Sequence, residues 1–278
     1  MQDWALILGS SSGFGAATCK ELAKRGIHIY GIHMDRKAGI DKVHNLVNSL
    51  QSKDVEVRFN NINAADSEKR QIVIDELKNI GDVRIKIFMH SLAFGTLKPI
   101  INTDATNALQ KRQIDMTLDV MCNSLIYWAQ DLYQENLLQK GSQIFAMTSS
   151  GGQRQWKTYG AVSAAKAGLE SYCRQLSIEL AEFGIAANSI QAGVTNTPAL
   201  RKIPGNEKMI KRAKMLRYCG IGKSGFDSAV SGENGKSRWW EYNITEPFIK
   251  MLPTDIAAAI GLAQLEKIDE LQAIRKDI

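Results

Sequence analysis

Three glycines in a short loop are the first residues whose spacing suggests a ligand. Gly9, Gly13 and Gly15 lie between a short apolar run and a helical pattern, as Gly-x-x-x-Gly-x-Gly. Glycines at a strand-to-helix turn let the backbone approach a pyrophosphate, whose charge is favoured by free N–H groups at the helix start. The alternative is a tight turn without a ligand. The residues expected to bind the phosphates are Gly9, Ser11, Ser12, Gly13, Phe14 and Gly15.

The second apolar run ends in the sequence His33, Met34, Asp35, Arg36 and Lys37. At this position an acidic side chain binds the ribose hydroxyls of NAD, whereas a basic one accepts the extra phosphate of NADP. If His33 ends the strand, the usual acidic position is not acidic and Arg36 or Lys37 reaches a phosphate. If Asp35 binds the ribose hydroxyls instead, Arg36 and Lys37 are solvent-exposed residues at the start of the next helix. We expect NADPH, with NADH as the alternative.

The elements that must position these residues follow a repeating pattern. Short apolar runs at 4–8, 27–32, 55–59, 85–89, 144–147 and 185–190 alternate with helix-period stretches at 16–24, 40–52, 67–79, 105–138 and 161–183. This alternation is typical of βαβ units, so we expect an α/β fold with a doubly wound parallel sheet, the Rossmann fold. Ligands bind such sheets at the carboxyl ends of the strands.

Composition excludes several other classes of protein. The 278 residues are 44% hydrophobic and 23% charged, which predicts one globular domain over 1–278. The formal charge of +6 comes from basic residues mixed with acidic ones, so we expect no nucleic-acid partner. Four scattered cysteines and four histidines without ligand spacing predict neither disulfides nor a metal. With no apolar run of membrane-spanning length and no room for a signal peptide before Gly9, we expect a cytoplasmic protein.

Further motifs occur in a fixed order after the glycine loop. Asn61 and Ile62 follow the third expected strand, Ser149 follows the fifth, and Tyr159 and Lys166 lie on the next helix. Over roughly residues 3–200 this order resembles the short-chain dehydrogenase/reductase family.

Within that family the sequence is similar to one divergent branch. Most members separate the tyrosine and lysine by three residues, whereas six residues lie between Tyr159 and Lys166. This wide spacing, the sequence 90–95 (His-Ser-Leu-Ala-Phe-Gly) and Asp119 resemble the enoyl-acyl-carrier-protein reductases. The glycine loop is closer to the ordinary family, and this combination resembles the Bacillus-type enoyl reductases, which implies NADPH.

The resemblance implies roles for individual residues. Tyr159 donates a hydrogen bond to the oxygen that becomes negative when hydride reaches an enoyl thioester, and Lys166 holds the nicotinamide ribose. Ser149 occupies the position of the family's catalytic serine, and is either catalytic or a local hydrogen-bonding residue. Asp119 either organises a water molecule that relays a proton or caps a break in its helix, and we favour the structural role. The further cofactor positions that the resemblance implies are Arg36, Asn61, Ile62, Ser91, Lys166, Val194 and Thr197.

The leading hypothesis is an NADPH-dependent enoyl thioester reductase acting on acyl-carrier-protein or coenzyme A substrates in fatty-acid or polyketide synthesis. The alternatives are a 3-oxoacyl or carbonyl reductase of the same family and a non-catalytic NADP-binding paralogue. We expect a substrate lid at 197–217 and an atypical insert at 218–246. The family's last strand is not evident after this insert. The family implies a homotetramer or dimer, and the missing strand argues against it.

Overall fold

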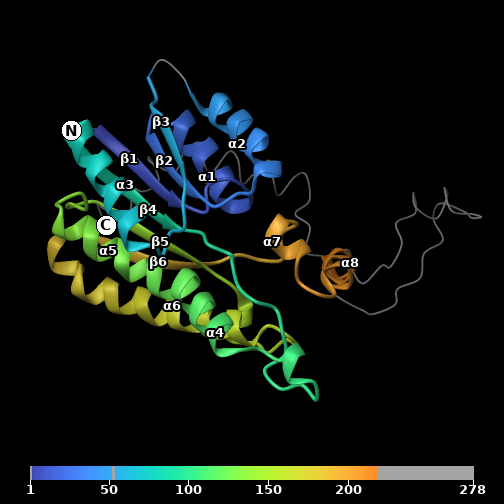
Figure 1. Ribbon diagram of the computed structural model, residues 1–278. Helices are drawn as coiled ribbons and strands as arrows, with labels where there is room; N and C mark the ends of the chain where they lie inside the picture. The colour runs from blue at the N-terminus through green and yellow to red at the C-terminus, as the bar shows by residue number, and fades with distance from the viewer. Residues whose placement is uncertain (1, 52–53, 218–278) are drawn as a thin grey trace, which may run out of the picture. The chain divides into compact units, whose positions relative to one another are not determined.

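A single parallel sheet organises the chain. The computed structural model describes residues 2–51 and 54–217, and its six strands are arranged in the order β3-β2-β1-β4-β5-β6 (Figure 1). They are β1 (Gln2–Leu8), β2 (His28–His33), β3 (Val57–Asn61), β4 (Val83–His90), β5 (Gln143–Thr148) and β6 (Ala186–Gln191). The order reverses between β1 and β4, which confirms the predicted doubly wound α/β fold.

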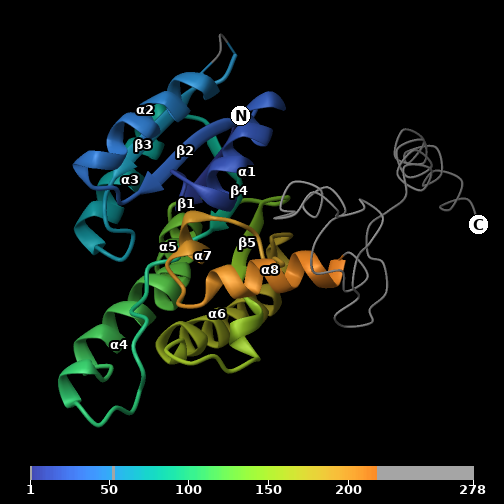
Figure 2. The same ribbon diagram turned by 90° about the vertical axis from the view of Figure 1, so that its right-hand side faces the viewer.

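Helices cover both faces of this sheet (Figures 1 and 2). On one face α1 (Gly13–Lys24) and α2 (Lys37–Leu50) pack over an apolar cluster that includes Ala5 and Ile7 of β1. On the other face α3 (Ser67–Ile80), α5 (Ser124–Gln134) and α6 (Gly160–Glu179) pack over a larger cluster that includes Trp4 and Leu6. Because β1 is buried on both faces, Trp4–Leu8 is a continuous apolar run rather than an alternating one.

The expected helix at 105–138 is wrong as a single element. The chain there forms a 3-10 turn η1 (Ala105–Asn107), then α4 (Lys111–Leu118), a π-helical turn η2 (Asp119–Asn123) and α5. Asp104 caps η1 by accepting from the N–H of Thr106 at 2.9 Å, and Gln110 with Gln113 forms a capping box that starts α4 afresh. The side chains that form these caps interrupt a pattern whose hydrophobic period is otherwise helical.

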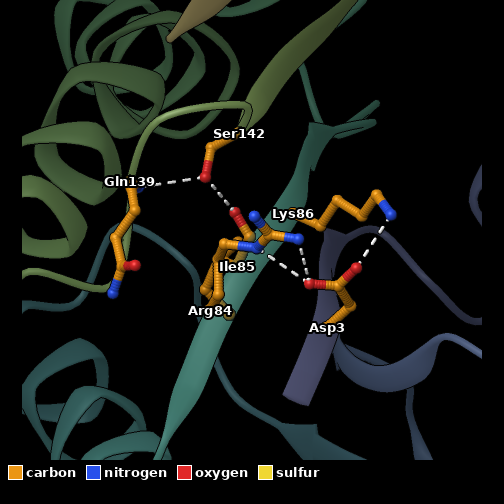
Figure 3. A network of polar contacts seen from close by, with 6 residues as sticks. All are labelled: Asp3, Arg84, Ile85, Lys86, Gln139 and Ser142. Carbon is orange, nitrogen blue, oxygen red and sulfur yellow. Dashed lines mark hydrogen bonds and ion pairs between the residues drawn. The ribbon is translucent and has the colours of Figure 1, made fainter. Parts of the chain in front are cut away.

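One irregularity in β4 decides which way its last residues face. Trp4 pairs with Ile85 but Ala5 pairs with Ile87, so Lys86 is an extra residue, a β-bulge. Before the bulge Ile85 faces the larger cluster; after it Phe88 faces the same side, three positions on rather than two. Asp3 anchors the segment with ion pairs to Arg84 and Lys86 at 2.6 and 2.8 Å (Figure 3).

Beside this network, one hydrogen bond ties β4 to the turn before β5, and a second lies within that turn. Ser142 Oγ donates to the carbonyl of Ile85 at 2.7 Å and accepts from the N–H of Gln139 at 3.0 Å (Figure 3). The neighbours of the bulge are therefore fixed on both sides by polar contacts.

The chain divides into two compact units, one ending at Pro204 and one beginning at Gly205. The first also contains η3 (Ser150–Gly152), η4 (Ala181–Phe183) and α7 (Pro198–Arg201); the described part of the second is α8 (Asn206–Arg217). The predicted lid at 197–217 spans this boundary and stays a prediction, while the insert and the missing strand lie outside the described residues. Across residues 2–51 and 54–217, no helix combines the length and apolarity needed to cross a membrane.

Candidate functional site

The glycine loop is packed too tightly for a larger residue at Gly9 and at Gly15. Gly9 has a φ of +85°, and its N–H donates to the carbonyl of Ile32 at 2.8 Å. A Cβ on Gly9 would overlap the carbonyl oxygen of Ser91, and one on Gly15 would overlap the carbonyl oxygen of Gly9. The loop between β1 and α1 therefore owes its path to glycine at both positions, as the sequence predicted.

The start of α1 leaves hydrogen-bond donors available. Ser12 precedes the helix with an extended backbone, and within the described residues its side chain makes no capping hydrogen bond. The first N–H groups of a helix have no partner inside it, so those of Gly13 and Phe14 can bind an anion. A Cβ on Gly13 would lie 3.5 Å from the methyl group of Thr197, which places that predicted phosphate contact beside the loop.

Hydrogen bonds from Asn61, the last residue of β3, hold the segment that follows β2. His33 is the last residue of β2, and its Nδ1 lies 3.0 Å from Oδ2 of Asp35. Asn61 grips the backbone of Asp35, accepting from its N–H at 3.0 Å and donating to its carbonyl at 2.9 Å. Arg36 and Lys37 are exposed, and among the described residues neither side chain has an ion-pair partner. One carboxylate oxygen of Asp35 is thus already in contact with His33, whereas the side chains of Arg36 and Lys37 have no ion-pair partner among the described residues.

Lys166 is the most deeply buried charged side chain of the described residues, 5% exposed. Its Nζ donates to the carbonyl of Met147 at 2.7 Å and to that of Leu92 at 3.2 Å. Burial lowers its pKa to about 8, against the opposing effects of the Cys122 thiol and the Glu170 carboxylate. An ammonium has three N–H donors. The third remains for a ligand.

Tyr159 lies immediately before α6, one position outside the helix that carries Lys166. A Cβ on Gly151 would overlap the ring of Tyr159, so the ring can occupy this position only because residue 151 has no side chain. Within the described residues the hydroxyl has no hydrogen-bond partner and is available to a substrate. Thr158 just before it has a φ of +68°, an unfavourable conformation for a β-branched residue, and its buried hydroxyl has no described partner.

Ser149 begins the η3 turn. Its Oγ accepts from the N–H of Gly151 at 3.1 Å, which is a local capping role. The hydroxyl proton is not used by this contact. The preceding residue, Thr148, donates to the carboxylate of Glu170 at 2.6 Å, and this carboxylate also lies beside Gly152.

The parallel strands bring most of the predicted residues to one edge of the sheet. Ser91 touches Gly9, Thr197 lies beside Gly13, and Lys166 reaches the carboxyl ends of β4 and β5. Two predicted positions have no such contact. Ile62 donates its N–H to His33 and packs on the core, and Val194 is exposed in the loop after β6.

Two residues, Glu170 and Ser124, stand out only in three dimensions. Glu170 and Ser124 follow no motif, and their partners are far away in the sequence. Asp119, interpreted as structural, begins the π-helical turn η2 and accepts from the hydroxyl of Tyr127 at 2.9 Å. Across the described residues, no three His, Cys, Asp or Glu side chains are grouped to hold a metal ion.

Comparison with known proteins gives the chain its relatives. A family model described as "Enoyl-(Acyl carrier protein) reductase" matches residues 9–220. The chain is 24% identical over 197 residues to 1-cyclohexenylcarbonyl-CoA reductase of Streptomyces collinus, covering 70% of this chain and 66% of that one. It is 21% identical over 244 residues to a very-long-chain 3-oxoacyl-CoA reductase of Podospora anserina, covering 87% and 68%. The chain thus spans about two thirds of the length of these curated relatives.

Two solved structures share the fold. The enoyl-[acyl-carrier-protein] reductase (NADH) of Aquifex aeolicus VF5 aligns with a TM-score of 0.64 at 20% identity, over 77% of this chain and 81% of that one. A short chain dehydrogenase of Burkholderia cenocepacia J2315 in complex with NADP aligns with a TM-score of 0.64 at 22% identity, over 77% and 82%. Both likenesses show the fold alone.

Proposed function

We propose that this chain, which belongs to the enoyl-(acyl carrier protein) reductase-like group of the short-chain dehydrogenase/reductase family, reduces 2-enoyl thioesters with NADPH. The observation that carries the proposal is the placement of Tyr159 and Lys166. The tyrosine precedes α6 with an uncommitted hydroxyl, while the lysine lies two turns into the helix and is buried against the ends of β4 and β5. The six residues between Tyr159 and Lys166, a spacing that resembles the enoyl reductases, place the tyrosine before α6 and the lysine inside it.

The residues present fit a dinucleotide. Gly9, Gly13 and Gly15 allow the close approach that a pyrophosphate needs, and the uncapped start of α1 supplies its donors. The third N–H of Lys166 is suited to the hydroxyls of the nicotinamide ribose.

NADPH rather than NADH is supported at the end of β2. His33 occupies one oxygen of the Asp35 carboxylate, which makes Asp35 less available to a ribose. Arg36 is exposed at the start of α2 and has no ion-pair partner in the described chain, so it is suited to a phosphate.

The chemistry requires a donor at one oxygen. When bound, the reduced nicotinamide supplies a hydride to the β-carbon of the enoyl thioester and is itself oxidised. Tyr159 donates a hydrogen bond to the thioester oxygen, on which negative charge develops, and the α-carbon then takes up a proton from solvent. The buried positive charge of Lys166 favours this charge in surroundings from which water is largely excluded.

A carbonyl reductase is the second candidate, because of Ser149. Its oxygen accepts from Gly151, and its proton has no acceptor among the described residues, so it can donate to a ketone oxygen together with Tyr159. The Podospora relative, named as a 3-oxoacyl-CoA reductase, fits this reading.

The test follows NADPH oxidation with crotonyl-CoA and acetoacetyl-CoA in parallel, and then with the same acyl groups on acyl carrier protein. We expect turnover of the enoyl substrate and a loss of about 100-fold or more in Tyr159→Phe, because one oxyanion donor is removed. Tyr172→Phe is the matched control: Tyr172 lies within α6, the helix that Tyr159 precedes, is exposed, and its hydroxyl donates to Asn123 at 3.4 Å. It should behave as the unmodified chain.

The other outcomes of this assay each identify one of the alternative functions. Oxidation with acetoacetyl-CoA alone identifies a carbonyl reductase, and Ser149→Ala should then abolish it. NADPH binding without turnover of any of these thioesters identifies a non-catalytic paralogue.

A further inference from the structure

A buried histidine that the proposed chemistry does not use lies beside the site. His90 is the last residue of β4 and is fully buried. Its Nε2 lies 2.9 Å from Oγ of Ser124, the first residue of α5. The hydroxyl of Ser124 donates in turn to the carbonyl of Val120 at 2.8 Å, inside the π-helical turn η2. A chain of hydrogen bonds therefore connects the end of β4 to η2.

These hydrogen bonds assign the tautomer of His90. Because the hydroxyl of Ser124 donates its single proton to Val120, we infer that Nε2 of His90 carries the proton that Ser124 accepts. Nδ1 is then an unprotonated acceptor, and it has no partner within the described residues. A lone pair without a partner is tolerated better than a buried N–H without one. Burial and the charge of Lys166 together lower the pKa of His90 to about 3, which keeps the ring neutral.

The two segments that His90 connects are those that hold Lys166. Leu92, two residues after His90, accepts a hydrogen bond from Lys166. From η2, Met121 and Cys122 pack in one cluster with the partly buried Tyr159. The bulge at Lys86 turns His90 toward this side of the sheet rather than toward α1 and α2.

We propose that His90 is a positioning residue that holds the end of β4 against η2, so that Lys166 keeps its place between the Leu92 carbonyl and Cys122. The proposal rests on the proposed function in one respect, the contact of Lys166 with the cofactor. The titratable groups facing Lys166 are His90 from β4, Cys122 from η2 and Glu170 from its own helix. Since His90 is neutral, it acts through geometry and not through charge.

The test compares two substitutions at one position. Glutamine at position 90 keeps an N–H donor within reach of Ser124, whereas leucine has similar bulk and no donor. We expect His90→Leu to weaken NADPH binding about 10-fold at pH 7, and His90→Gln to stay within about 3-fold. Fluorescence titration of NADPH with the full chain measures this without requiring turnover.

The pH dependence of binding separates positioning from mere stability. NADPH affinity should fall above pH 8, where Lys166 loses its proton. Opening the contact between β4 and η2 admits water to Lys166 and moves this fall toward the ordinary lysine value of 10.5. We expect the shift in His90→Leu and in Ser124→Ala, which removes the acceptor with a smaller change, but not in His90→Gln.

The outcomes are distinct from those of the activity test. An unshifted fall in both His90→Leu and Ser124→Ala overturns the positioning role, even if the chain reduces crotonyl-CoA. If His90→Leu does not fold, Ser124→Ala decides. Nitrogen-15 NMR of the unmodified chain should show His90 as the Nε2–H tautomer from pH 5 to 9. An Nδ1–H ring, or a titration near 6.5, overturns the proposal whether or not any thioester is reduced.

Discussion

The two halves of the sheet build their parts of the site in different ways. From β1 to β3 the site is formed mainly by backbone groups. Glycines permit close approach, the N–H groups at the start of α1 can bind an anion, and Asn61 forms two hydrogen bonds with the main chain of Asp35. From β4 to β6 it is made by buried polar side chains. Lys166 contacts carbonyls 74 and 19 residues away, and His90 contacts Ser124 34 residues away. A backbone-built region is defined by local sequence, whereas the other depends on the whole fold.

The register of β4 after the bulge tests this contrast with the largest expected effect. Inserting one alanine between Ile87 and Phe88 adds a residue beyond the bulge, so that Phe88 and His90 turn to the opposite face of the sheet while Ile85 keeps its place. We expect a loss of more than about 4 kcal/mol in the free energy of unfolding, or no folded protein, because buried apolar and polar groups exchange sides. Urea denaturation measures it.

The control leaves the length of β4 unchanged and removes only the side chain of Lys86. Lys86→Ala loses an ion pair to Asp3 in which the lysine is 43% exposed, and should cost under about 1 kcal/mol. If the insertion costs as little as the substitution, the placement of Phe88 and His90 on this face of the sheet does not contribute to stability.

The glycine loop predicts a second, smaller effect confined to the first half. Gly9→Ala places a methyl group against the Ser91 carbonyl at a φ of +85°. We expect a loss of about 2–4 kcal/mol in stability. We also expect NADPH affinity to fall at least about 10-fold, because Ser91 and the loop must move apart. Calorimetric melting and fluorescence titration of NADPH measure the two effects.

Gly26→Ala is its matched control. Gly26 has a φ of +77°, but a Cβ there meets nothing within 4 Å. It should cost about 1 kcal/mol through backbone strain alone, and leave NADPH binding unchanged. Equal losses of affinity in the two variants would mean that crowding at Ser91 is irrelevant to the cofactor.

The comparison also explains what could be predicted from the sequence. All six strands were predicted within a few residues, because each is an apolar run bounded by turn residues, and Gly9 and Gly15 were identified from spacing alone. A break in the long helix was expected at Asp119, where η2 begins, but the separate start of α4 after Gln110 was missed, since the hydrophobic periodicity continues through it. Ser124 and Glu170 were not found because serine and glutamate on helices are ordinarily solvated, and only the fold supplies their partners.

Lys166 predicts an effect on stability that appears only as the pH changes. Its pKa is about 8 in the folded chain and 10.5 when unfolded. Between these values the unfolded chain still holds the proton that the folded chain has lost, so this group makes stability rise with pH. The full contribution is about 3 kcal/mol, present above pH 10.5 and lost as the pH falls to 8.

Lys166→Met, which keeps an unbranched side chain of similar length, removes this contribution and leaves every other titrating group in place. The free energy of unfolding of the unmodified chain, minus that of the variant, should therefore increase between pH 8 and pH 10. Urea titrations at several pH values across this window give the difference directly. A constant difference would show that Lys166 is solvated in the folded chain, and with it the contrast between a backbone-built half and a half built from buried charge would lose its main support.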